Sequence, residues 1–134
     1  MGYKCVYMLS EIKEYLKNTV RVAFDFETSP HDKWRNDKSA ALDAHKADIT
    51  GISFSVSEGT AIYVPLKHRS GRNAENQAAI WDYLKLLFES KDVIKVAHNL
   101  AFESMFLYAR GIVLQKPCYD TIAASQLTLK SKWE

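Results

Sequence analysis

Two acidic side chains stand two positions apart inside a strongly apolar segment of the sequence. Asp25 and Glu27 alternate there with Phe24 and Phe26. Because successive side chains of a β-strand point to opposite faces, we expect both carboxylates on one face. Their mutual repulsion favours a hard divalent cation with oxygen ligands, Mg²⁺ or Mn²⁺. Such a pair alone is also typical of an exposed edge strand, but the apolar flanks favour a site.

A second group of polar side chains follows a predicted strand near residue 97. Asn99 and Glu103 lie about one helical turn apart, at a junction of strand and helix. Ligand-binding groups of α/β sheets gather at such junctions, so both side chains can face one crevice. The alternative is structural, because an Asn often caps a helix and a Glu in the first turn complements the helix dipole.

The elements that must position these residues alternate along the chain. Apolar and β-branched runs predict strands over residues 5–9, 20–27, 49–57, 60–66 and 93–97, and an extended piece over 113–119. Helical periodicity predicts helices over 10–18, 73–90 and 98–111, and one more that opens at Asp120 and carries Ile122. Ser10 and Asn73 are the expected caps of the first two helices. Residues 28–48 are expected to form a long connection, with a helical turn over 40–45.

This order of elements predicts an α/β fold with a mixed five-stranded sheet flanked by helices. The first three main strands are expected to be antiparallel, and the later ones are joined by helical crossovers. The same order is used by ribonuclease H-like folds. With 134 residues, of which 47% are hydrophobic, we expect a single domain over residues 1–134.

The composition of the sequence limits which partners and which cellular location are expected. No apolar run approaches the roughly 18 residues needed to cross a bilayer, and the N-terminus lacks the features of a signal peptide. We therefore expect a cytoplasmic protein without a membrane partner. Two basic loops, 28–48 and 67–72, could meet phosphates, in keeping with a net charge of +2. The alternative is that they carry solvated charges, partly balanced by Asp32, Asp37, Asp43 and Asp48.

Taken together, the segments over residues 22–28 and 96–103 resemble the DEDD superfamily of 3′-5′ exonucleases. Nearer still, they resemble the proofreading domain of family A DNA polymerases, of the bacterial polymerase I type and its phage relatives. Residues 49–55, 61–66 and 119–121 match the same family in order and spacing, so the resemblance covers nearly the whole chain.

The resemblance implies a two-metal site with Mg²⁺ or Mn²⁺ that hydrolyses the 3′-terminal phosphodiester. Asp25 would bridge both ions, and Glu27 would hold one of them. Glu103 occupies the place of an acidic ligand that is usually Asp, and its longer side chain moves the carboxylate by about 1.5 Å. These three residues are therefore the implied catalytic and metal-binding residues.

The same resemblance implies that the substrate is the 3′ end of single-stranded DNA. Glu27 would contact the terminal 3′-hydroxyl, and Thr28, Asn99 and Phe102 would contact the bound strand. For Phe102, packing in the core is the favoured alternative. Asp120 is expected to open a helix and not to bind a metal.

One motif of the family is missing from these residues. No Tyr-x-x-x-Asp or His-x-x-x-Asp follows Asp120, so the last carboxylate and the water-orienting group are lacking. We therefore expect a C-terminally incomplete exonuclease domain with weak metal binding and little or no activity, and a polymerase domain is a candidate for the downstream part of the parent protein. Two alternatives stay open: an RNA exonuclease of the ribonuclease D type, and a non-catalytic nucleic-acid-binding module of the same fold.

Overall fold

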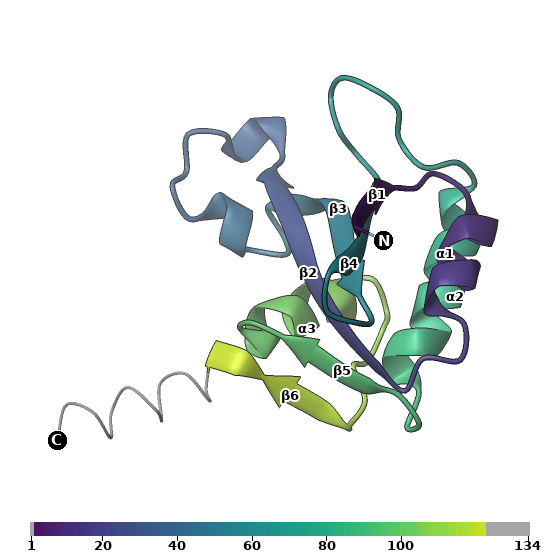
Figure 1. Cartoon of the computed structure of the whole chain (residues 1–134). Helices are drawn as coiled ribbons and strands as arrows, with labels where there is room; N and C mark the ends of the chain where they lie inside the picture. The colour runs from purple at the N-terminus through teal and green to yellow at the C-terminus, as the bar shows by residue number, and fades with distance from the viewer. Residues whose placement is uncertain (1, 123–134) are drawn as a thin grey trace, which may run out of the picture.

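A six-stranded mixed sheet runs through the computed structural model, which describes residues 2–122 (Figure 1). Its strands are β1 (Gly2–Cys5), β2 (Arg21–Pro30), β3 (Ala47–Ser55), β4 (Thr60–Pro65), β5 (Ile94–Ala97) and β6 (Cys118–Asp120). They are arranged in the order β1-β4-β3-β2-β5-β6. β3 pairs antiparallel with β2 and β4, whereas the β1–β4, β2–β5 and β5–β6 pairs are parallel. The predicted α/β class with a mixed sheet is confirmed.

The helices connect and cover this sheet. They are α1 (Leu9–Leu16), α2 (Gln77–Glu89) and α3 (Leu100–Ala109), with two short 3-10 helices, η1 (Asp32–Trp34) and η2 (Ala40–Leu42). As predicted, α2 is the crossover from β4 to β5, and α3 is the crossover from β5 to β6. Within residues 2–122, none of the helices has the length and apolar character needed to span a membrane.

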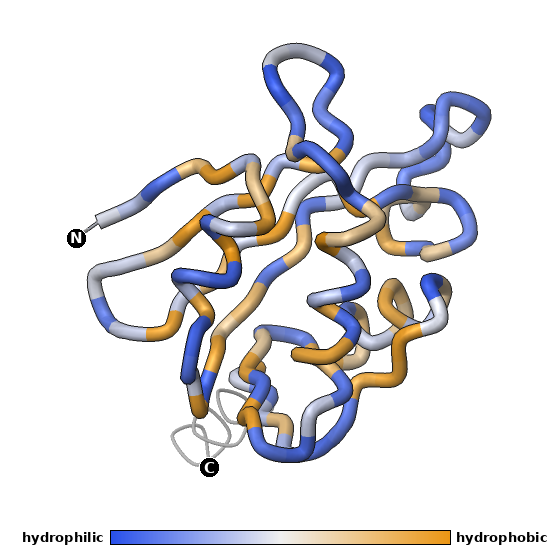
Figure 2. Tube along the Cα trace, turned by 90° about the vertical axis from the view of Figure 1, so that its right-hand side faces the viewer, coloured by the Kyte–Doolittle hydropathy of each residue, from blue (hydrophilic) through white to orange (hydrophobic). Residues whose placement is uncertain are grey.

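The helices pack on one face of the sheet because β2 alternates strictly. Phe24 and Phe26 are buried, whereas Asp25 and Glu27 are exposed on the other face. Phe88 of α2 is the central contact, since its ring centroid lies 4.8 Å from that of Phe24 and 6.2 Å from that of Phe26. Buried residues of α1 and α3 join the same core cluster. The connection between β2 and β3 and the connection between β4 and α2 lie above the sheet in Figure 1. Both are mostly hydrophilic in Figure 2.

The start of the chain differs from the prediction. The first strand is Gly2–Cys5 and not residues 5–9, and it adds a sixth strand because it pairs with β4 at the sheet edge. α1 begins at Leu9, with Met8 and not Ser10 at the N-cap. The physical reason is Glu11, whose Oε1 accepts hydrogen bonds from the backbone N–H groups of Tyr7 and Met8, both at 3.3 Å. This places the first helical turn before Ser10 can cap it.

Asn73 does not cap α2, which begins at Gln77. Its side chain instead accepts from the His68 N–H at 2.9 Å and donates to the His68 carbonyl at 3.0 Å, which closes the basic loop. The predicted helix after Asp120 lies outside the described residues beyond Ile122.

β2 does not end at Glu27 but continues to Pro30. The reason is that it pairs with β3 as far as Ala47, with an irregularity in register between Glu27 and Thr28. The connection is therefore shorter than residues 28–48. It contains two short helical turns, η1 and η2, and η2 lies within the predicted range 40–45.

Several charges of the two basic loops are paired with the aspartates of residues 28–48. Arg69 lies 2.5 Å from Asp32, and Lys67 lies 3.4 Å from Asp48. These pairs join the two loops and agree with the alternative of balanced, solvated charges. Exposed pairs of this kind contribute little to stability.

We expect Phe88→Ala to lower the free energy of unfolding by about 3–5 kcal/mol, because it leaves a cavity under three phenylalanine rings. Chemical denaturation followed by circular dichroism measures this loss. The control is Leu86→Ala in the same helix, whose side chain is 72% exposed, and it should change stability by less than about 0.5 kcal/mol. Equal effects of the two substitutions would contradict the described core.

Candidate functional site

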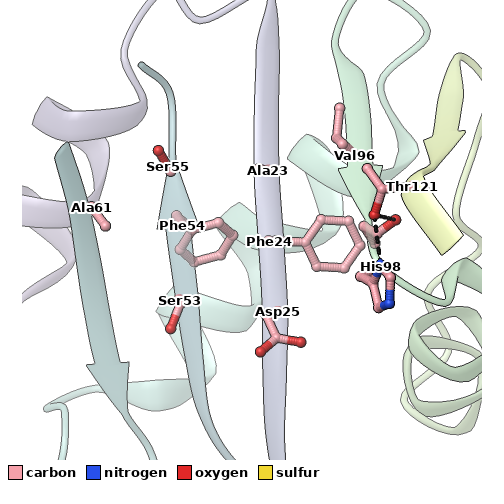
Figure 3. Close-up of a pocket in the computed structure, with 11 residues that line it drawn as sticks. Ala23, Phe24, Asp25, Ser53, Phe54, Ser55, Ala61, Val96, His98 and Thr121 are labelled. Carbon is pink, nitrogen blue, oxygen red and sulfur yellow. Dashed lines mark hydrogen bonds between the residues drawn. The ribbon is translucent and has the colours of Figure 1, made fainter. Parts of the chain in front are cut away.

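A shallow hollow of about 460 Å³ lies on the sheet face that the three helices leave uncovered. Small side chains from neighbouring strands form its floor, among them Ala23, Ser53 and Ala61, with Asp25 at one end (Figure 3). His98 lines the same hollow, and its Nδ1 lies 2.9 Å from the Thr121 hydroxyl. The face with the predicted carboxylates is thus open to a ligand.

Glu103 reaches Asp25 at the point where β5 ends and β2 runs on. β2 pairs with β5 only up to Ala23, so its edge beyond Ala23 is not paired with β5. The first turn of α3 brings Glu103 to that edge, where its carboxyl lies close enough to Asp25 and to the backbone N–H of Phe26 for both to shift its pKa. The tertiary structure therefore brings together two of the three predicted metal ligands.

The surroundings of Glu103 disfavour its negative charge. The residue is only 1% exposed, and burial, reinforced by the charge of Asp25, raises the pKa of its carboxyl to about 8. Among residues 2–122, its Oε2 is buried without a hydrogen-bond partner. A buried carboxyl group with an unsatisfied oxygen, placed beside a second acidic side chain, becomes a suitable environment for a divalent cation once it loses its proton.

Glu27 is on the same face as Asp25 but is held by a different contact. The Tyr63 hydroxyl donates to its Oε2 at 3.0 Å. Burial and this hydrogen bond raise the pKa of the Tyr63 phenol. Within the described part of the chain, no three His, Cys, Asp or Glu side chains are close enough together to hold a metal ion. Asp25 and Glu103 therefore fit a cation as a pair, and the role of Glu27 as a ligand stays a prediction.

The residues predicted to contact the substrate all have structural partners. The Thr28 hydroxyl donates to the Ala41 carbonyl at 2.6 Å. Asn99 has a left-handed backbone with a φ of 73°, and its side chain caps α3 by accepting from the Phe102 N–H at 3.4 Å. The Phe102 ring packs on Phe106, with the centroids 5.0 Å apart. Their contacts with a nucleic-acid strand remain predictions.

Asp120 does more than open the next helix. Its Oδ1 accepts from the Ile122 N–H at 3.0 Å, which agrees with the predicted cap. The same carboxylate accepts from the backbone N–H of Asn99 at 3.0 Å and from that of Leu100 at 3.1 Å. Asp120 thereby fixes the start of α3 and, one turn later, Glu103.

Sequence reasoning missed Tyr63, His98 and this role of Asp120. A usable signal existed for Tyr63, because strand alternation puts it on the same face as Ser53, its partner in register. For Asp120 the only signal would have been the parallel pairing of β6 with β5, which the order of elements allows but does not fix.

Comparison with known proteins gives a match over nearly the whole chain. A family model described as 3′-5′ exonuclease matches residues 4–133. DNA polymerase I of Pseudomonas aeruginosa is 32% identical over 114 residues, which cover 82% of this chain and 11% of that protein. The chain spans about a tenth of the length of the curated relatives that it matches.

Solved structures give the same arrangement of elements. Brucella melitensis NrnC with bound Mg²⁺ has a TM-score of 0.63 at 20% identity, over 97% of this chain and 54% of that one. Escherichia coli RNase D, described as an exoribonuclease involved in structured RNA processing, has a TM-score of 0.59 at 17% identity. The comparison covers 90% of this chain and 28% of the RNase D chain. At these identities the comparison shows the fold alone, and it confirms the predicted ribonuclease H-like α/β class.

The raised pKa of Glu103 predicts a pH-dependent loss of stability. The folded protein keeps the proton up to about pH 8, whereas the unfolded chain loses it near the ordinary value of 4.5. The free energy of unfolding should therefore fall as pH rises from about 4.5 to about 8, and then level off. Glu103→Gln removes this loss and should stabilise the protein above pH 8 by a few kcal/mol, up to about 5 kcal/mol for a shift of this size, with no difference at pH 4.

Urea unfolding at pH 4, 6 and 9 measures this effect. The matched control is Glu58→Gln at an exposed turn, which should show no such pH-dependent difference. A stability difference for Glu103→Gln that is the same at every pH would contradict the assigned environment.

We expect Asp120→Ala to loosen the first turn of α3 and to lower the free energy of unfolding by about 1.5–3 kcal/mol, because the hydrogen bonds involve a charged acceptor. Amide hydrogen exchange measured by NMR should speed up at Asn99 and Leu100. The control is Asp82→Ala on the exposed side of α2. Unchanged exchange at both amides would rule out this role of Asp120.

Proposed function

Because the chain belongs to the 3′-5′ exonuclease family of the family A DNA polymerases, we propose that it acts on the 3′ end of single-stranded DNA. By this family membership it is a hydrolase domain. The observation that supports a working site is the contact between Asp25 and Glu103, with a buried carboxylate oxygen that lacks a hydrogen-bond partner among residues 2–122.

Asp25 and Glu103 are the proposed holders of a divalent cation, with Glu27 as a further ligand. When bound, Mg²⁺ or Mn²⁺ would act as a Lewis acid on the terminal phosphodiester. The Glu103 carboxyl must give up its proton to bind the cation, because its pKa in the cation-free protein is about 8. Asp25, which is exposed on the open face, presents its carboxylate to the strand.

The open sheet face is the proposed path of the nucleic-acid strand. Small side chains such as Ala23, Ser53 and Ala61 line part of its hollow and leave room for a strand next to Asp25. Glu27 would receive the terminal 3′-hydroxyl, and Asn99, Thr28 and Phe102 would border the strand. The family resemblance supports these assignments.

These 134 residues supply Asp25, Glu27 and Glu103 but no aspartate after Asp120. The relatives named DNA polymerase I are far longer, and a polymerase domain in the same polypeptide is the proposed partner in a proofreading role.

The test is binding of a 5′-fluorescent single-stranded DNA with a free 3′-hydroxyl, measured by fluorescence anisotropy in Mn²⁺ and in EDTA. We expect Mn²⁺ to tighten binding at least about tenfold, which corresponds to about 1.4 kcal/mol. Asp25→Asn and Glu103→Gln should abolish this gain, whereas Asp82→Asn should keep it. An oligonucleotide blocked by a 3′-phosphate should gain less.

The alternatives give different results in the same experiment. Binding that falls with salt but ignores Mn²⁺ and Asp25→Asn would contradict the enzyme proposal and support a non-catalytic binding module. An Mn²⁺-dependent gain on RNA and not on DNA would replace the DNA substrate with an RNA substrate of the ribonuclease D type.

A further inference from the structure

A chain of hydrogen bonds connects the basic loop to Glu27. The Tyr63 hydroxyl lies 3.0 Å from Glu27 Oε2 and 2.5 Å from His68 Nε2. Glu27 is on β2, Tyr63 is on β4, and His68 is in the loop after β4. The contact therefore spans the intervening strand β3 and connects segments far apart in sequence.

Gly51 is what allows Tyr63 to span β3. Gly51 is paired in register with Glu27, and a Cβ built on it would lie 1.8 Å from the Tyr63 hydroxyl oxygen and 2.3 Å from the ring carbon Cζ. Gly51 does not have a positive φ, so its backbone conformation does not require glycine. Glycine is required here by the lack of space, because the end of the Tyr63 side chain occupies the position that a Cβ would take.

The direction of the hydrogen bonds follows from counting protons. A tyrosine hydroxyl has one proton, and an ionised carboxylate can only accept. If Tyr63 donates to Glu27, His68 must donate through Nε2 to the Tyr63 oxygen. The chain therefore runs from His68 through Tyr63 to Glu27 Oε2, which leaves the other carboxylate oxygen of Glu27 for a ligand.

His68 is itself held in place. The Asn73 side chain binds both the N–H and the carbonyl of His68, at 2.9 and 3.0 Å. The Tyr63 and His68 rings also pack edge to face, with their centroids 5.6 Å apart. The imidazole is thus presented by a fixed backbone, whereas an isolated Glu27 side chain on an exposed strand face would sample several rotamers.

We propose that Tyr63 and His68 are positioning residues that hold the Glu27 carboxylate in one orientation toward the ligand at the open sheet face. Gly51 leaves the space that the Tyr63 ring occupies. This inference rests on the proposed function. Neither residue touches the reacting atoms in this proposal, since each acts through Glu27.

The test uses the Mn²⁺-dependent gain in binding of 3′-hydroxyl DNA by the whole chain. Tyr63→Phe removes only the hydroxyl, and we expect the gain to fall about tenfold, as is common for residues that orient a metal ligand. His68→Leu should act in the same direction, and His68→Gln should restore binding because its side chain keeps an N–H donor. Gly51→Ala should match Tyr63→Phe, and adding it to Tyr63→Phe should cause no further loss.

The matched control is Tyr15→Phe. This substitution removes a hydroxyl that lies 2.8 Å from the Thr60 hydroxyl, in a part of the protein away from the site, and the variant should bind DNA like the wild type. Thermal unfolding and binding in EDTA are measured for every variant. A loss in EDTA that equals the loss in Mn²⁺, or a loss that follows the melting temperature, would indicate a merely structural role and overturn the proposal.

The two proposals fail in different ways. If the wild type binds with an Mn²⁺-dependent gain that Asp25→Asn removes, while Tyr63→Phe and His68→Leu bind like the wild type, the positioning role is wrong and the proposed function stands. If the wild type shows no Mn²⁺-dependent gain, the proposed function fails, and the positioning role fails with it.

Discussion

The candidate site depends on one contact, that of the buried Glu103 carboxyl with Asp25. It forms because β5 ends while β2 continues, which leaves part of the β2 edge for the first turn of α3 to occupy. A carboxyl in this position is disfavoured as an anion by its burial and by its neighbour, and one of its oxygens lacks a hydrogen bond among the described residues. Such an arrangement costs stability in the absence of a cation, and the same feature makes it suited to bind one.

The rest of the fold holds this contact in place. Asp120, at the end of β6, binds the backbone where α3 begins, and the left-handed Asn99 caps the same turn. Beneath the sheet, the packing of Phe88 against Phe24 and Phe26 fixes α2 and the inner side of β2. A well-packed apolar face can therefore offset the unfavourable burial of one carboxyl on the site side.

The asymmetry of the sheet explains why the site is accessible. Helices cover the face with the phenylalanines, whereas the described residues leave the face with Asp25 and Glu27 open. On that open face, the absence of a side chain at Gly51 is as important as the presence of one at Tyr63, because the ring reaches Glu27 through the space that Gly51 leaves. Positive and negative charges of the two loops pair with one another at the same end of the sheet.

The sequence by itself determined the class of fold and two of the local arrangements. Alternation in β2 put Asp25 and Glu27 on one face, and the one-turn spacing put Glu103 beside Asn99 at a helix start, because both follow from local periodicity. Tertiary structure decided the rest. The sixth strand, the extension of β2, the hydrogen bonds of Asp120 to α3 and the reach of Tyr63 across Gly51 all depend on which strands pair and in which register, and a local pattern does not encode register between distant segments.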